Sequence, residues 1–184
     1  MKRTKLSLVS LFLFVFNSGL LAQFTHVGAS ADYGSWIKEF GASAYVIYSI
    51  SEKIDIVLNG TYYWPHTVDV EYGTNEFTWW TINMDGHYVV FEKNIIQVFG
   101  LMGLNFTNEV KRIEETIQGQ VFKDKINTNK LGLNIGAGLQ LPVSKYFIPF
   151  TEVKYTLGER HQFGLCLGIL VRIAPDKIRD EMEY

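Results

Sequence analysis

The chain has 184 residues, of which 47% are hydrophobic, 15% aromatic and 20% charged, a length that suits a single domain. With 17 basic and 19 acidic residues and no basic block, it lacks the charge pattern of a nucleic-acid-binding protein. The single cysteine excludes an intrachain disulfide and a cysteine-based metal cluster.

The first 22 residues have the three-part layout of a secretory signal peptide. Lys2, Arg3 and Lys5 form a basic start, residues 6–16 are almost continuously apolar, and Ala22 supplies a small residue at a plausible cleavage point. The alternative is a membrane-anchoring helix, but the apolar run is shorter than the roughly 18–20 residues that such a helix needs. We therefore expect residues 1–22 to direct export and to be removed.

Eight segments of the remaining chain alternate between large apolar side chains and small or polar ones. A period of two residues predicts β-strands with one apolar face, and a helical period fits none of these segments. The predicted strands are, in chain order, Val27–Tyr33, Phe40–Ile50, Ile54–Trp64, Trp80–Val90, Ile96–Phe106, Leu131–Leu141, Phe147–Leu157 and Gln162–Ile173. No segment after residue 22 contains the long apolar run of a spanning helix.

The connections between these strands alternate in length. Three connections are short turns, at residues 51–53, 92–94 and 142–145. Two are long and polar, at 65–76 and 107–130, and two are of intermediate length, at 34–39 and 158–161. Short turns at the end that holds both termini, with longer loops at the other, are typical of a transmembrane barrel. The sequence thus predicts an all-β, eight-stranded antiparallel up-and-down transmembrane β-barrel over residues 23–173, followed by a charged tail at 174–184. We expect residues 107–130 to prolong their two strands as a protruding hairpin.

The two faces of the strands predict where lipid and water lie. The face opposite the apolar one is rich in glycine, as the narrow interior of an eight-stranded barrel requires. It also carries seven residues that we expect to form an interior polar network with a structural role: Asp32, Asp55, Asp85, His87, Glu152, Lys154 and Arg172. Aromatic residues near the strand ends of the apolar face, such as Trp64 and Trp80, match interfacial girdles. A soluble lipocalin-like carrier would point its apolar face inward, so lipid outside is the better interpretation.

With these features, the chain resembles the small eight-stranded outer-membrane barrels of Gram-negative bacteria, the OmpX/OmpA-like β-barrel family, over residues 23–173. The segments LGLNIGAGLQLPV (131–143) and YFIPFTEVKYTLG (146–158) are similar to the closing strands of that family. The resemblance implies an outer-membrane location, contact with lipid and lipopolysaccharide, and insertion by the barrel-assembly machinery. One departure is that such barrels often end on an aromatic residue of the last strand, whereas a charged tail follows here.

The resemblance also raises catalysis, because barrels of this type include enzymes that act on lipid A. None of the four histidines has a serine two positions away, which is the pattern of the deacylase type. His87 and Asp85 could pair as a base and its orienting acid, but no nucleophile is evident beside them. We expect no enzymatic activity, no catalytic residues, no cofactor and no metal, and we expect Cys166 to be a small core residue.

The rim of the barrel and the long connections are the remaining candidates for binding sites. His66, Asp69 and Glu71 could bind a cation, although nothing in the sequence fixes their geometry, and Lys111 and Arg112 could contact lipopolysaccharide phosphates. Because function on a rigid scaffold tends to lie in loops, residues 65–76 and 107–130 are the expected contact surface for an extracellular partner. The sequence favours a structural or surface-interaction role; the alternatives are a narrow porin-like channel, a lipid A-modifying enzyme and a soluble periplasmic carrier.

Overall fold

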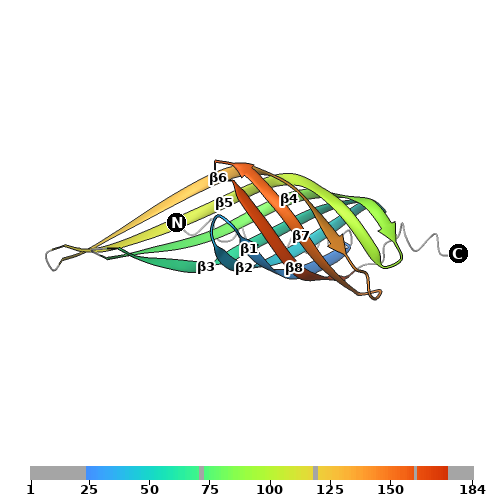
Figure 1. Ribbon diagram of the computed structural model, residues 1–184, viewed down its shortest axis with the longest axis horizontal. Coiled ribbons are helices and arrows are strands. Elements are labelled where there is room, and N and C mark those ends of the chain that lie inside the picture. Colours follow the sequence, from blue (N-terminus) through green and yellow to red (C-terminus); the bar gives the residue numbers. More distant parts are fainter. Residues whose placement is uncertain (1–23, 71–72, 118–119, 160, 174–184) are drawn as a thin grey trace, which may run out of the picture.

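A computed structural model shows a closed barrel of eight antiparallel strands (Figure 1). It describes residues 24–70, 73–117, 120–159 and 161–173, so the expected signal peptide and charged tail lie outside the described residues. The strands are β1 (His26–Gly34), β2 (Glu39–Ser51), β3 (Ile54–Val70), β4 (Gly73–Lys93), β5 (Ile96–Ile117), β6 (Gln120–Gln140), β7 (Phe147–Gly158) and β8 (Gln162–Arg172). All eight predicted strands are present, which confirms the predicted fold class.

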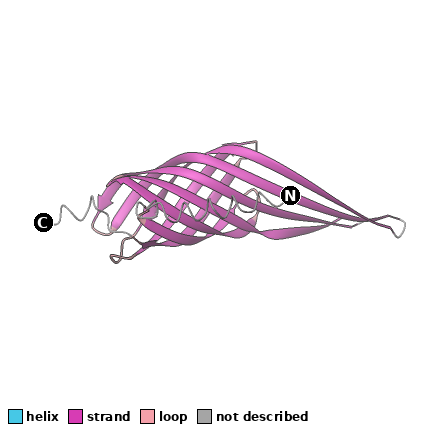
Figure 2. Ribbon diagram, turned by 180° about the vertical axis from the view of Figure 1, so that it is seen from behind, coloured by secondary structure: helices cyan, strands magenta, loops and turns pink. Residues whose placement is uncertain are grey.

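Each strand pairs with its neighbours in sequence, and β1 pairs with β8 to close the ring. In the closing ladder Ala29 lies opposite Ile169, and the pairing runs without a break from His26 opposite Arg172 to Gly34 opposite Gly164. Figure 2 shows the resulting cylinder from the other side, built of strands alone. Closure leaves no unpaired sheet edge in the ring, so backbone donors and acceptors there meet partners on the adjacent strands. No described helix is long and apolar enough to cross a membrane.

Burial alternates along the strands as the sequence predicts. On β8, Leu167 is 69% exposed on the outside while Leu170 is 1% exposed on the inside. The same contrast holds elsewhere in the ring, from Leu131 (76% exposed, outward) to Val57 (buried, inward). The outer surface of the barrel is therefore apolar, and the inner surface holds the polar residues and a smaller apolar cluster.

Two glycines on the inner face of β6 let neighbouring groups approach closely. A Cβ atom at Gly138 would meet the ring of Phe99, and one at Gly136 would meet the carbonyl oxygen of Val153 on β7. These positions explain why the inner face alternates with small residues: the ring is too narrow for a side chain at every inward position.

Four strands continue beyond the ring as a four-stranded sheet, which we call the arm (residues 65–70, 73–78, 108–117 and 120–129). In Figure 1 the arm projects from the end of the barrel opposite the short turns. The expectation that residues 107–130 form a protruding hairpin is confirmed, with Ile117 opposite Gln120 near its tip. The expectation that residues 65–76 form a polar connection is wrong, because β3 runs to Val70 and β4 begins at Gly73. Because the side chains of that segment are largely polar, the sequence analysis did not recognise it as an extension of the β3–β4 ladder.

A β-bulge marks the base of the arm on β3. Tyr63 pairs with Trp79, but the next pair is His66 with Phe77, so the two residues 64 and 65 lie opposite a single residue of β4. Residue 65 is a proline, which has no amide hydrogen for the ladder, and a bulge is one of the few places in a sheet that tolerates it. An extra residue also exchanges the two faces of a strand. As a result, even-numbered residues of β3 face inward in the arm, whereas odd-numbered ones do so in the barrel.

Candidate functional site

The inward side chains gather a charged cluster halfway along the barrel. Lys154 on β7 places its Nζ 3.3 Å from Asp85 Oδ2 on β4 and 4.0 Å from Glu152 Oε2. His87 Nε2 lies 3.8 Å from Glu152 Oε1, and Asn134 Nδ2 donates to Asp85 Oδ1 at 2.8 Å. Asp85 is completely buried. Four of the seven predicted network residues, Lys154 among them, thus meet in one cluster.

Asp32 belongs to a neighbouring group on β1 and β2. Its Oδ2 accepts hydrogen bonds from Ser30 and Ser43, each at 2.7 Å, and Ser43 also bonds Thr61 at 2.7 Å. Hydroxyl donors therefore satisfy this buried carboxylate. Of the two remaining predicted residues, Asp55 borders the cluster, opposite His87 in the β3–β4 ladder, and Arg172 is opposite His26 near the short-turn end of the barrel.

A chain of amide side chains, which the sequence analysis did not include in the network, connects β3, β4, β5 and β6. Asn83 donates to Asn59 at 2.7 Å and accepts from Asn105 at 2.7 Å and from Asn134 at 2.9 Å. Thr156 on β7 closes the chain by donating to Asn134 at 2.8 Å. The available signal was the asparagine at an inward position of four successive strands. An amide side chain can both donate and accept, so each asparagine of the chain can bond to the next.

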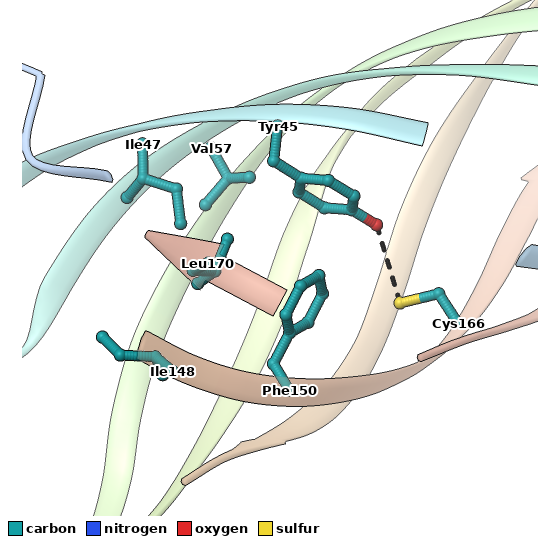
Figure 3. Close-up of a cluster of buried hydrophobic side chains, with 7 residues drawn as sticks. All are labelled: Tyr45, Ile47, Val57, Ile148, Phe150, Cys166 and Leu170. Carbon is teal, nitrogen blue, oxygen red and sulfur yellow. Dashed lines mark hydrogen bonds between the residues drawn. The ribbon is translucent and has the colours of Figure 1, made fainter. Parts of the chain in front are cut away.

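An apolar cluster, which we call the plug, lies inside the barrel in the half nearer the short turns, and Figure 3 shows its side chains pointing toward one another. Its members are Tyr45, Ile47, Val57, Ile148, Phe150, Cys166 and Leu170. The rings of Tyr45 and Phe150 meet edge to face with centroids 5.1 Å apart, and the Tyr45 hydroxyl donates to Cys166 Sγ at 3.6 Å. Beside the plug, Phe99 stacks on His87 at 4.4 Å. These side chains pack against one another in this half of the described interior, and inward polar residues such as Gln97 and Gln140 lie nearer the short turns.

Above the charged cluster the interior opens into a small vestibule. It has a volume of about 60 Å³, room for only a few water molecules, and polar groups including Asp32, Glu152 and Lys154 line it. The β1–β2 turn covers its mouth: Ile37 is buried against Tyr63 and Trp79. Lys38, the next residue, adopts a left-handed backbone (φ 58°), which lets the turn fold inward over the ring.

The predicted cation site at the rim is not assembled. His66 Nδ1 lies 2.7 Å from Glu39 Oε1 on β2, while Asp69 is on the opposite face of β3, and Glu71 lies outside the described residues. Within the part of the chain that the structure describes, no three histidine, cysteine or acidic side chains are placed to hold a metal ion.

The two basic residues predicted at the rim point to opposite faces of the arm. Arg112 Nη1 forms an ion pair with Glu76 Oε1 at 3.1 Å on the outer face. Lys111 places its Nζ over the ring of Phe77, 5.5 Å from the centroid, on the inner face. Nearby, Lys130 bonds Glu109 at 2.9 Å and lies over the Trp36 ring. The two predicted phosphate ligands therefore do not form a single site.

No family model matches the chain, and no curated protein matches it in sequence. Among solved structures, a major outer membrane protein from Thermus thermophilus aligns with a TM-score of 0.60 and 14% identity, covering 82% of this chain and 98% of that one. The attachment invasion locus protein Ail of Yersinia pestis aligns at 0.52 and 14%, covering 81% and 95%. Neisserial surface protein A aligns at 0.52 and 12%, covering 83% and 96%. At such low identities, these likenesses show that the chain shares the fold of eight-stranded outer-membrane barrels.

Proposed function

We propose that this chain is an outer-membrane β-barrel protein with a structural or surface-interaction role. The observation that carries the proposal is the apolar outer surface of the ring, where Met102, Leu131 and Leu167 are each more than two-thirds exposed. Apolar surface exposed to water costs about 25 cal/mol per Å², and soluble monomers rarely expose large contiguous apolar patches. Lipid around the barrel removes that cost.

The proposed membrane boundary lies where aromatic residues end the apolar belt. Towards the arm the outward aromatic residues are Tyr33, Phe40, Tyr62, Trp64, Trp80, Phe106 and Phe163; towards the short turns they are Tyr48, Tyr88, Phe91, Tyr146 and Phe147. Tyrosine and tryptophan favour the interface between hydrocarbon and water. Level with Trp80, the outward positions of β5 and β6 are already polar, with Asn108 and Asn129. The arm would therefore stand outside the hydrocarbon layer, among lipopolysaccharide head groups.

The closed interior favours a role on the surface rather than in transport. The apolar plug fills one half of the barrel and the Ile37 turn covers the other. The arm is then the main feature exposed to the surroundings, and we propose it as the contact surface for an extracellular partner. The barrel-assembly machinery would insert the chain.

Fractionation of cells that express the chain tests the proposal. We expect it to sediment with the outer membrane, to require detergent for release, and to migrate faster on a gel before boiling than after, because a folded barrel is compact and resists the detergent. Release in the soluble fraction with no change of mobility on boiling would instead favour the soluble carrier.

The second candidate is a narrow channel. The polar vestibule favours it, because it has room for a few water molecules inside the barrel. A channel would give discrete single-channel currents in planar bilayers, which a plugged interior should not. The third candidate, a lipid A-modifying enzyme, predicts that deleting the gene changes the mass spectrum of lipid A. We expect no change, because the neighbours of His87 at the charged cluster are Glu152 and an aromatic ring.

A further inference from the structure

One face of the arm carries most of its apolar side chains, and the other is mostly charged or polar. Strand partners directly opposite each other share a face, so the ladders assign every position. The apolar side chains of the inner face, which continues the inside of the barrel, are Val68, Val70, Phe77, Ile113, Phe122 and Ile126. The outer face carries Glu76, Arg112, Glu114, Lys123 and Lys125, of which Arg112 with Glu76 and Lys123 with Glu114 form ion pairs.

Much of the inner face is uncovered. Phe122 is 53% exposed and Ile126 46%, while Val68 and Val70 are each about 40% exposed. The bulge at residues 64 and 65 is what turns the two valines to this side, since without it they would share a face with Glu76. A sheet with one apolar face ordinarily packs that face against something.

The area of the inner face argues against a protein partner. Two strands about 20 Å long and two about 33 Å long, spaced about 4.8 Å apart, present roughly 500 Å². A stable protein–protein interface needs about 800 Å² on each side. A second copy of the arm would thus bury too little surface to hold a dimer, whereas a hydrocarbon chain needs no more than a strip of this face.

Lys111 is the lysine that the ladders place on the inner face of the arm, and its positive charge favours an anionic ligand. Lys111 lies on the inner face beside Ile126 and packs over Phe77. Two acidic residues share that face nearer the tip: Asp124 lies opposite Ile113, and the ladder places Glu115 opposite Phe122. Among the side chains that the structure describes, no carboxylate lies within ion-pair distance of the Lys111 ammonium group, whereas three other basic residues of this region have acidic partners. A half-buried ammonium without a counter-ion is stabilised by an anion brought by a ligand.

We propose that the inner face of the arm binds a single-chain anionic amphiphile from the surrounding medium. Its hydrocarbon chain lies across Ile113, Ile126 and the β3 valines, and its carboxylate pairs with Lys111. This inference rests on the proposed function, because it names the class of partner that the arm takes.

The test uses the full chain in lipid nanodiscs, with carbon-13 labels on the isoleucine methyl groups and decanoate as the probe. Saturable shifts of the Ile113 and Ile126 signals report binding at the arm, whereas shifts at Ile82 in the outer belt report partition into lipid. We expect decanoate to bind at least about fivefold more tightly than decyltrimethylammonium, which has the same chain with a cationic head. Lys111→Gln should remove that preference, and Lys125→Gln, on the outer face, should leave it unchanged.

A second pair of variants tests the apolar contact. Ile126→Ser should weaken decanoate binding about tenfold, read from the Ile113 signal, while Val110→Ser on the outer face should not. The proposal is overturned by an absence of saturable shifts at the arm, by equal affinity for both head groups, or by arm signals that depend on protein concentration without decanoate, which would show a second copy on this face. Heat-modifiable migration of the same samples separates these failures from a failure to form the barrel.

Discussion

Lys154 lies at the centre of the charged cluster inside the barrel. Its ammonium group has Asp85 at 3.3 Å and Glu152 at 4.0 Å, and Asp85 also accepts a hydrogen bond from Asn134. Ionised groups in a packed interior lose several kcal/mol of hydration, so each depends on its partner. The lysine and the completely buried aspartate are therefore a unit, and removing either leaves a buried charge uncompensated.

Replacement of that lysine should be costly. Lys154→Met keeps most of the side-chain volume but leaves the buried Asp85 carboxylate without its counter-ion. We therefore expect the free energy of unfolding to fall by about 3–5 kcal/mol. The measurement is urea-induced unfolding in lipid vesicles, followed by tryptophan fluorescence. The double variant Lys154→Met/Asp85→Asn removes both charges and should recover part of the loss. Wild-type stability in the single variant would contradict the ion pair.

Two glycines of the barrel should respond differently to an added methyl group. Gly136→Ala puts a Cβ against the carbonyl oxygen of Val153, so we expect a loss of about 1–3 kcal/mol in the same unfolding assay. Gly100→Ala is the matched control, because a Cβ there meets no atom within 4 Å. Equal effects of the two substitutions would show that contact inside the ring does not set the choice of glycine.

At the scale of elements, alternation alone was enough to predict the eight strands and their outward faces. It could not give the full length of β3 and β4, because the bulge at Trp64 and Pro65 interrupts the period and the arm's outer residues are charged. Nor could it give the apolar plug, since Tyr45, Phe99 and Phe150 appear as irregularities on the face expected to hold small and polar residues.

The polar network, too, could be predicted only in part from the sequence. The inward face of each charged residue follows from its place in a strand, and four of the seven do meet at one cluster. Which residues pair depends on the stagger between distant strands: Lys154 and Asp85 are 69 positions apart, on strands that are not neighbours in the ring. A single sequence carries no record of that stagger, so Asp32 and Arg172 could not be separated from the cluster in advance.

The arm should be dispensable for the barrel. Tyr63 pairs with Trp79 and Glu109 with Thr128 at its base, so residues 65–77 and 110–127 can each be replaced by an Asn-Gly turn without changing the register of the ring. We expect this variant to reach the outer membrane and to keep heat-modifiable migration. If it failed to fold while expressed at the normal level, the arm would be part of the folding unit.

At the scale of the whole molecule, the interior is closed in two different ways. The apolar plug lies in the short-turn half, and a polar vestibule covered by the β1–β2 turn occupies the other. Water and ions would have to displace packed side chains to pass, and such displacement is costly in an interior as dense as an organic crystal.

Removing two aromatic members of the plug should open that path. We expect Tyr45→Ala/Phe150→Ala to show single-channel currents in planar bilayers, because the deleted rings meet across the interior, whereas the wild-type protein shows none. Outward-facing Phe40→Ala/Tyr62→Ala is the matched control and should stay silent. Currents of equal size in wild type and plug variant would mean that the plug does not seal the barrel.

The most direct test of the account asks what surrounds the barrel. Nitroxide spin labels at Ile82, Ile135 and Leu167, each outward in the ring, and at Lys125 on the arm would be introduced singly into the Cys166→Ser background and reconstituted in lipid. Power-saturation measurements compare collisions with oxygen, which concentrates in hydrocarbon, and with a water-soluble nickel complex. The account predicts that oxygen dominates at the three ring positions and nickel at Lys125; nickel access at the ring positions would contradict a membrane-spanning barrel.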